Sequence, residues 1–76
     1  MRIVDVWKQG NDVLAYCIGE GIDEKFSCKE ISANGNTYQV AAFDVLKSIN
    51  GNISAVLKIS GVEVEDVPHG TINVID

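Results

Sequence analysis

The stretch Ile53-Ser54-Ala55-Val56-Leu57-Lys58-Ile59 decides the fold class of this sequence. Every second residue from Ile53 to Ile59 is apolar, whereas Ser54 and Lys58 lie between them. This period of two is typical of a β-strand that buries one of its faces. The preceding Asn50-Gly51 suits a turn, and Gly61 follows the run. We therefore expect a strand here, with Leu57 pointing into a hydrophobic core.

Shorter runs of the same kind lie on both sides of this strand. The expected strands cover residues 3–7, 13–18, 26–31, 38–42, 53–59, 62–65 and 72–74. The run 13–18 is apolar on both faces, as in a central strand or a closed barrel. Asn34-Gly35 is suited to the positive φ angles of a tight hairpin turn. The pattern predicts an all-β fold, a small closed or partly open antiparallel β-barrel of six to seven strands.

The segment 39–49 has a second interpretation. Val40, Phe43 and Leu46 recur at intervals of three, and Asn50-Gly51 could end a helix. A short helix and a strand followed by a loop therefore both remain open for these residues.

Length and composition agree with one small β domain. The chain has 76 residues, too few for two hydrophobic cores, so a single domain is expected over 1–76. Isoleucine and valine together number 19, against three leucines, and β-branched residues favour strands. No apolar run approaches the ~20 residues of a membrane-spanning helix, and we do not expect the opening residues to act as a secretory signal.

The charge balance limits the classes of partner. Eleven acidic residues against six basic ones give a formal net charge of −5. Binding to nucleic acid needs clustered Lys and Arg, which this chain lacks. We expect a protein partner, with RNA disfavoured and neither DNA nor membrane binding. The oligomeric state stays open.

No set of residues forms a catalytic motif. His69 is the only histidine, lies in the turn Pro68-His69-Gly70, and has no evident partner in the sequence. The acidic groups lack the spacing of a calcium loop. We expect no enzymatic activity, no metal and no cofactor, and we expect most of the aromatic rings to lie in the core: Trp7, Tyr16, Phe26, Tyr38 and Phe43.

The two cysteines, Cys17 and Cys28, lie in apolar surroundings without the CxxC spacing of a metal or redox site. They are expected to be buried thiols in a reducing cytoplasm, so a cytoplasmic location is expected. Whether they pair in a disulfide stays open.

Several motifs of the chain resemble the second, β-barrel domain of elongation factor Tu and related translational GTPases. The first is the run 55–61, an apolar strand that ends in Gly61, followed by an acidic stretch and then Gly70. The second is the run 42–47, in which an acid and a base flank two apolar residues. The opening strand 3–7 and Glu20-Gly21-Ile22 are similar to the family's first strands. The resemblance is collinear along the chain.

The resemblance implies a strand at 40–43 with a loop after it. It also implies a pocket for the aminoacylated end of tRNA, in which the acid and the base are Asp44 and Lys47. No GTPase domain precedes Met1, so a free-standing barrel without nucleotide hydrolysis is expected. In the family this barrel packs against neighbouring domains as well as RNA, so a protein-binding role is equally consistent with the resemblance. Without a GTPase domain, the shared fold alone does not imply the family's function.

These observations favour a non-enzymatic binding or adaptor module that docks on a protein partner. The first alternative is a translation-linked domain that contacts aminoacyl-tRNA or ribosomal RNA through Asp44 and Lys47. The second alternative is a self-associating structural protein.

Overall fold

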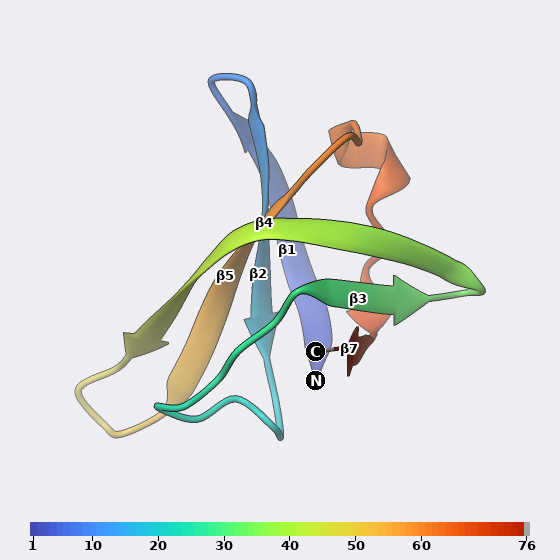
Figure 1. The fold of residues 1–76 in the computed structure, drawn as a ribbon. Helices are drawn as coiled ribbons and strands as arrows, with labels where there is room; N and C mark the ends of the chain where they lie inside the picture. Colours follow the sequence, from blue (N-terminus) through green and yellow to red (C-terminus); the bar gives the residue numbers. More distant parts are fainter. Residues whose placement is uncertain (76) are drawn as a thin grey trace.

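Antiparallel strands make up most of the regular structure. The structure is a computed structural model, and it describes residues 1–75. Its strands, together with one 3-10 turn, η1, follow the chain in this order: β1 (Arg2–Gln9), β2 (Asp12–Ile18), β3 (Glu30–Ala33), β4 (Asn36–Lys47), β5 (Ile53–Ile59), η1 (Val64–Asp66), β6 (Gly70–Thr71) and β7 (Asn73–Ile75) (Figure 1).

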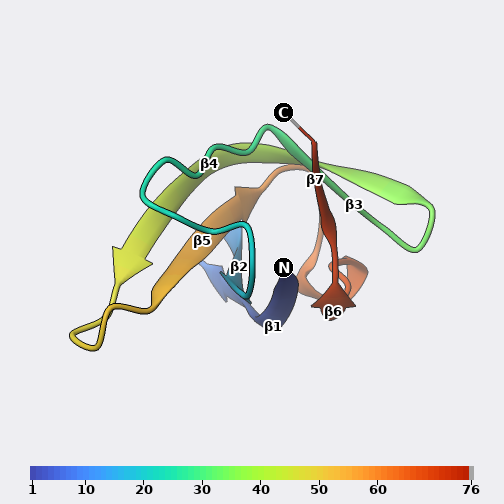
Figure 2. The same cartoon turned by 90° about the horizontal axis from the view of Figure 1, so that it is seen from below.

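The strands form one sheet that almost closes on itself. Its order is β6-β1-β2-β5-β4-β3-β7, and all the pairings are antiparallel. Only Ile72 separates β6 from β7 in the chain, so the two ends of the sheet belong to one continuous segment. Seen from below, the strands surround a common interior (Figure 2). The predicted small antiparallel barrel is therefore confirmed, with seven strands in the part of the chain that the structure describes.

Alternate residues of the central strands fill the barrel. In β5, Ala55 and Leu57 are fully buried and Ile59 is 3% exposed, which confirms the expected inward face. Ala55 and Leu57 lie beside Cys17 and Ala15 of β2 in the sheet. Together with residues from the other elements they form one core, whose remaining buried members are Ile3, Val13, Ile22, Phe26, Cys28, Ile31, Ala33, Val67 and Ile72.

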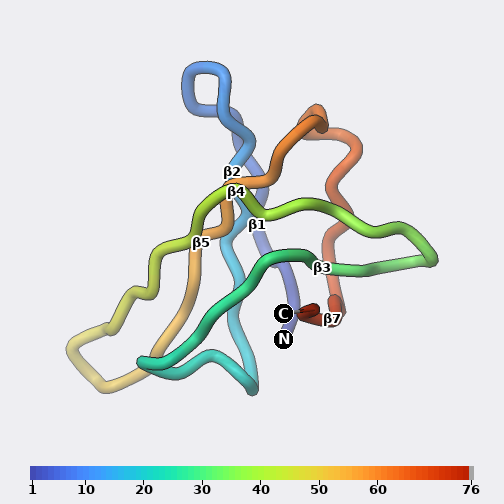
Figure 3. Tube along the Cα trace, viewed as in Figure 1, coloured from blue at the N-terminus to red at the C-terminus, as the bar shows by residue number. Residues whose placement is uncertain are grey.

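Tight turns connect the paired strands. Asn34 and Gly35 have φ angles of 53° and 82°, the left-handed conformation that a two-residue hairpin turn requires. This turn joins β3 to β4, as the sequence predicts. The hairpins β1–β2, β3–β4 and β4–β5 project in three different directions from the barrel (Figure 3).

The helix considered for residues 39–49 is wrong, and so is the loop expected after Phe43. Strand β4 continues to Lys47, because its second half pairs with β5, where Val45 lies beside Ala55. The register shifts between Val40 and Ala42. Such a bulge bends a strand, which lets β4 pair first with β3 and then with β5. The bulge accounts for the interval of three between Val40 and Phe43, whereas Leu46 lies on the opposite face of the strand from Phe43.

Two of the expected strands are also wrong. Residues 19–29 form a long loop, and β3 begins only at Glu30. This loop covers one end of the barrel, where it buries Ile22, Phe26 and Cys28. The run 62–65 is not a strand, since η1 begins at Val64 and the Asp66 carboxylate accepts a hydrogen bond from the Glu63 amide at 3.0 Å.

Candidate functional site

Asp44 and Lys47 lie on the same strand but on opposite faces of it. Asp44 lies beside Val56 of β5, and both point away from the core. Lys47 lies beside Ile53, and Ile53 packs against the core. The Nζ atom of Lys47 forms an ion pair with Glu24 Oε1 at 3.0 Å. Three residues apart on a strand, two side chains necessarily diverge. The structure therefore does not bring the two predicted site residues together, and their ligand-binding role stays a prediction.

The outer surface of four neighbouring strands carries an ordered grid of side chains. We call this surface the outer face. It spans β4, β5, β2 and β1, and its residues are those that alternate with the buried ones. The strand registers arrange them in three rows: Ala42, Lys58, Leu14 and Trp7; then Asp44, Val56, Tyr16 and Asp5; then Leu46 and Ser54 with Ile18 and Arg2.

The centre of the outer face is apolar. Leu14, Tyr16 and Ile18 of β2 and Val56 of β5 are half-buried, although no further layer of the described chain covers them. Leu46 at one border is 45% exposed. Antiparallel sheets that face water usually alternate apolar and polar residues, so a strand that is apolar on both faces is unusual.

The charged residues of the outer face lie at its borders. Lys58 is held by Asp12, with Nζ and Oδ1 3.4 Å apart. Asp5 and Asp44 are exposed at the two ends of the middle row, and neither has an ion pair among residues 1–75. Arg2 occupies one corner. Two carboxylates free to bind cations therefore flank Val56 and Tyr16.

A cleft of about 750 Å³ adjoins the outer face where β2 ends and β5 begins. Tyr16, Ile18 and Ile53 line it on the sheet side, and Glu20 lies on its border. The turn between β4 and β5 also lines it, and in this turn the Asn52 amide donates to Ser48 Oγ at 3.1 Å. Ile49 at this turn is fully exposed. The cleft combines an apolar floor with hydroxyl and amide groups, a composition that suits a partner's side chain.

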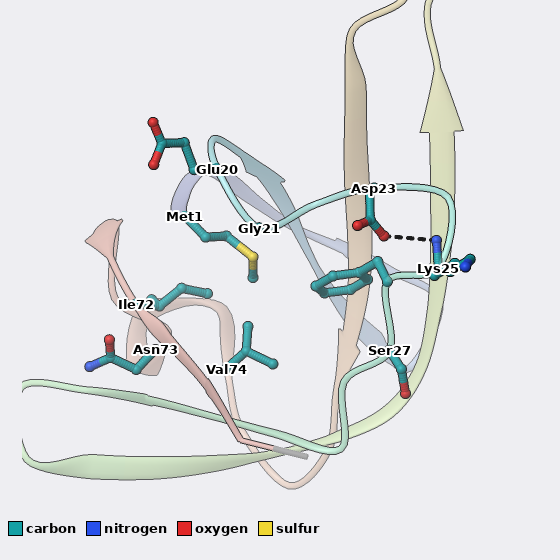
Figure 4. A pocket seen from close by; sticks show the side chains of 10 residues that line it. Met1, Glu20, Gly21, Asp23, Lys25, Ser27, Ile72, Asn73 and Val74 are labelled. Carbon is teal, nitrogen blue, oxygen red and sulfur yellow. Dashed lines mark hydrogen bonds between the residues drawn. The ribbon is translucent and has the colours of Figure 1, made fainter.

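A second cleft, of about 490 Å³, lies between the 19–29 loop and the C-terminal segment. Met1, Ile72 and Val74 point into it, whereas Glu20 and Ser27 point away from it (Figure 4). Its shape depends on the loop, where the Lys25 amide donates to Asp23 Oδ1 at 2.8 Å. The rim polar groups do not converge on one point of the cleft, so we do not assign a ligand to it.

The expectation that most of the aromatic rings lie in the core is wrong. Only Phe26 is buried, and its ring contacts that of Phe43 edge to face, with centroids 5.6 Å apart. Trp7 and Tyr16 belong instead to the outer face. Sequence reasoning missed this site, although one signal pointed to it: residues 13–18 are apolar on both faces, and a one-layer sheet can bury only one of them.

Both cysteines are buried, and they do not form a disulfide with each other. Cys28 Sγ donates to the Glu30 carbonyl at 3.4 Å, and Cys17 is fully buried on β2. Burial raises the pKa of the Cys17 thiol to about 12, and the nearby Cys28 adds to the increase. A thiol that stays protonated at neutral pH is a poor nucleophile, so we assign Cys17 a role in core packing.

Neither His69 nor the acidic side chains form a further candidate site among residues 1–75. His69 is exposed beside β6, outside the outer face. Among residues 1–75, no three His, Cys, Asp or Glu side chains are placed to hold a metal ion. The same residues contain no helix long and apolar enough to cross a membrane.

Comparisons of the chain with protein-family models, with curated proteins and with solved structures gave no match. The resemblance to the second domain of elongation factor Tu therefore rests on the sequence motifs alone.

Proposed function

We propose that this chain is a non-enzymatic binding module that docks on a protein partner through the outer face. One observation carries the proposal: Leu14, Tyr16, Ile18 and Val56 form an apolar surface that no described part of the chain covers. Water contact with such a surface is unfavourable, and docking removes it. The adjoining cleft is a hollow beside this surface, and a side chain of a complementary partner can fill it.

Side chains must provide this recognition, because the backbone of the two central strands is already paired. Strand β2 pairs with β1 and β5, and β5 pairs with β2 and β4. A partner therefore cannot add a strand at the centre of the outer face. It must present apolar side chains to the sheet instead.

The RNA alternative gains no support from the arrangement of Asp44 and Lys47. Lys47 is engaged by Glu24, and Asp44 adds negative charge on the other face of the strand. RNA contacts depend on cations that neutralise phosphates, so they weaken steeply with added salt. Salt dependence and ribonuclease sensitivity of any captured complex separate the two functions.

The first test is capture from a native lysate of the source organism with a single substitution on the outer face. Val56→Asp places a charge in the middle row and should remove any partner that docks there, with at least a tenfold loss of recovered protein. The matched control is Ile75→Asp, because Ile75 is similarly apolar and is 41% exposed on β7, away from this face. Mass spectrometry identifies the proteins recovered.

Three results would contradict the proposal. The first is a partner that both variants recover equally, and the second is one that only Ile75→Asp loses. The third is a complex that disappears with ribonuclease, which would support the translation-linked function. Circular dichroism of each variant checks that the barrel stays folded.

A further inference from the structure

The outer face is small, and its size limits what can cover it. Neighbouring strands lie about 4.8 Å apart, so the four strands from β4 to β1 place their axes about 14 Å across. The three rows extend about 14 Å along the strands, since residues on one face repeat about every 6.8 Å. An area on the order of 200 Å² results. A standard interface buries about 800 Å² per partner, so a second copy or another globular domain would cover too little here.

A single helix matches these dimensions. With its side chains, an α-helix is about 10–12 Å wide, and about nine residues of helix extend over about 14 Å. A helix centred over Val56 and Tyr16 would lie between the two borders of the face. The paired backbone of β2 and β5 excludes an added strand there, whereas a helix binds through side chains alone.

The charges at the borders define the flanks of such a helix. Asp5 and Asp44 lie at the two ends of the middle row, one on each side of Val56 and Tyr16. Glu20 lines the adjoining cleft. Of the two cations on the face, Lys58 is paired with Asp12, which leaves Arg2 at one corner. Lys or Arg side chains on both flanks of the helix would therefore find carboxylates, with their stems along the apolar surface.

We propose that the outer face binds a basic amphipathic helix of a protein partner. Its apolar stripe covers Leu14, Tyr16, Ile18 and Val56, and its flanking cations pair with Asp5 and Asp44. This inference rests on the proposed function, since it specifies the partner of the same surface. The complex needs no covalent or redox step.

Trp7, the only tryptophan in the chain, lies on the outer face and reports binding directly. The probe is a synthetic 18-residue helical peptide with a leucine stripe flanked by lysines, used at concentrations where it is monomeric. A tryptophan-free sequence leaves Trp7 as the sole fluorophore of that type. Binding should shift the Trp7 emission to shorter wavelength in a saturable manner, because the helix removes water from the indole.

Matched variants separate the specific contacts from the net charge of −5. Asp5→Asn with Asp44→Asn should raise the Kd about tenfold, the combined effect of two exposed ion pairs. The control, Glu30→Gln with Glu65→Gln, removes the same charge from β3 and η1 and should change the Kd less than twofold. A peptide with glutamate in place of each lysine should bind at least tenfold more weakly.

Each of the following three results would overturn the inference. Equal weakening by both double variants would mean attraction to net charge alone. Equal affinity for the lysine and glutamate peptides would exclude cationic flanks and would leave the apolar docking of the proposed function intact. An unchanged Trp7 emission would exclude a helix at this surface. The capture experiment with Val56→Asp tests the proposed function without the helical peptide, so the two failures are distinguishable.

Discussion

Leu57→Asp is expected to abolish folding of the barrel. Leu57 is fully buried at the centre of β5, beside Ala15 on one side and Phe43 on the other. An ionised carboxylate there would be buried without a partner, and such substitutions cost more than about 4–5 kcal/mol. A chain of this length has a total stability of roughly 4–11 kcal/mol. Far-ultraviolet circular dichroism and urea denaturation should show an unfolded or nearly unfolded protein at 25 °C.

Val56→Asp provides the control for this prediction on the adjacent residue. Val56 points to the outer face, where water solvates a carboxylate, so this variant should stay folded and lose about 1 kcal/mol of strand propensity and packing. The difference between the two neighbours tests the assigned faces of β5. A folded Leu57→Asp monomer, or an unfolded Val56→Asp, would show that those faces are inverted.

Alkaline pH is expected to destabilise the barrel through Cys17. The folded state holds the pKa of this thiol near 12, above the ordinary value of 9.0. Below pH 9 both folded and unfolded chains keep the proton, so the full stability is present. Between pH 9 and about 12 the unfolded chain loses the proton and the folded one keeps it. The free energy of unfolding should then fall by about 1.4 kcal/mol per pH unit, on the order of 4 kcal/mol over this range.

Cys17→Ala isolates this contribution from other groups that titrate at high pH. Urea denaturation under reducing conditions should show that the wild type loses about 1 kcal/mol more than Cys17→Ala between pH 8 and pH 10. The alanine side chain keeps the site apolar, so the variant should fold at pH 8. Parallel pH profiles of the two proteins would mean that the Cys17 thiolate forms as readily in the folded chain as in the unfolded one.

The sequence predicted those parts of the fold in which the residue pattern within one strand decides which of its faces is buried. The alternation in 53–59 correctly placed Leu57 in the core, and Asn34-Gly35 correctly placed a hairpin turn. The prediction from sequence failed where pairing with distant strands or packing against the core overrides the local residue pattern. The bulge near Ala41 disturbs the period of β4, and the apolar residues of the 19–29 loop serve to cover the end of the barrel rather than to form a strand.

The candidate site was harder to predict because it depends on which strands are neighbours. Asp44 and Lys47 are close in sequence, but the alternation of β4 sends them to opposite faces. Trp7, Tyr16 and Val56 are distant in sequence, and only the β1–β2–β5 pairing places them together. Their apolar character suggested a core because sequence alone does not distinguish the inner from the outer surface of a closed sheet.

Amide chemical-shift mapping of the ¹⁵N-labelled protein with the lysine-flanked helical peptide tests the central claim most directly. The account predicts that the largest shifts fall on the outer face: Trp7, Leu14, Tyr16, Ile18, Asp44 and Val56. Residues around the second cleft, such as Lys25, Ser27 and Asn73, should not move. Shifts centred on that cleft, or spread evenly over the acidic surface, would contradict the assignment of the outer face as the docking surface.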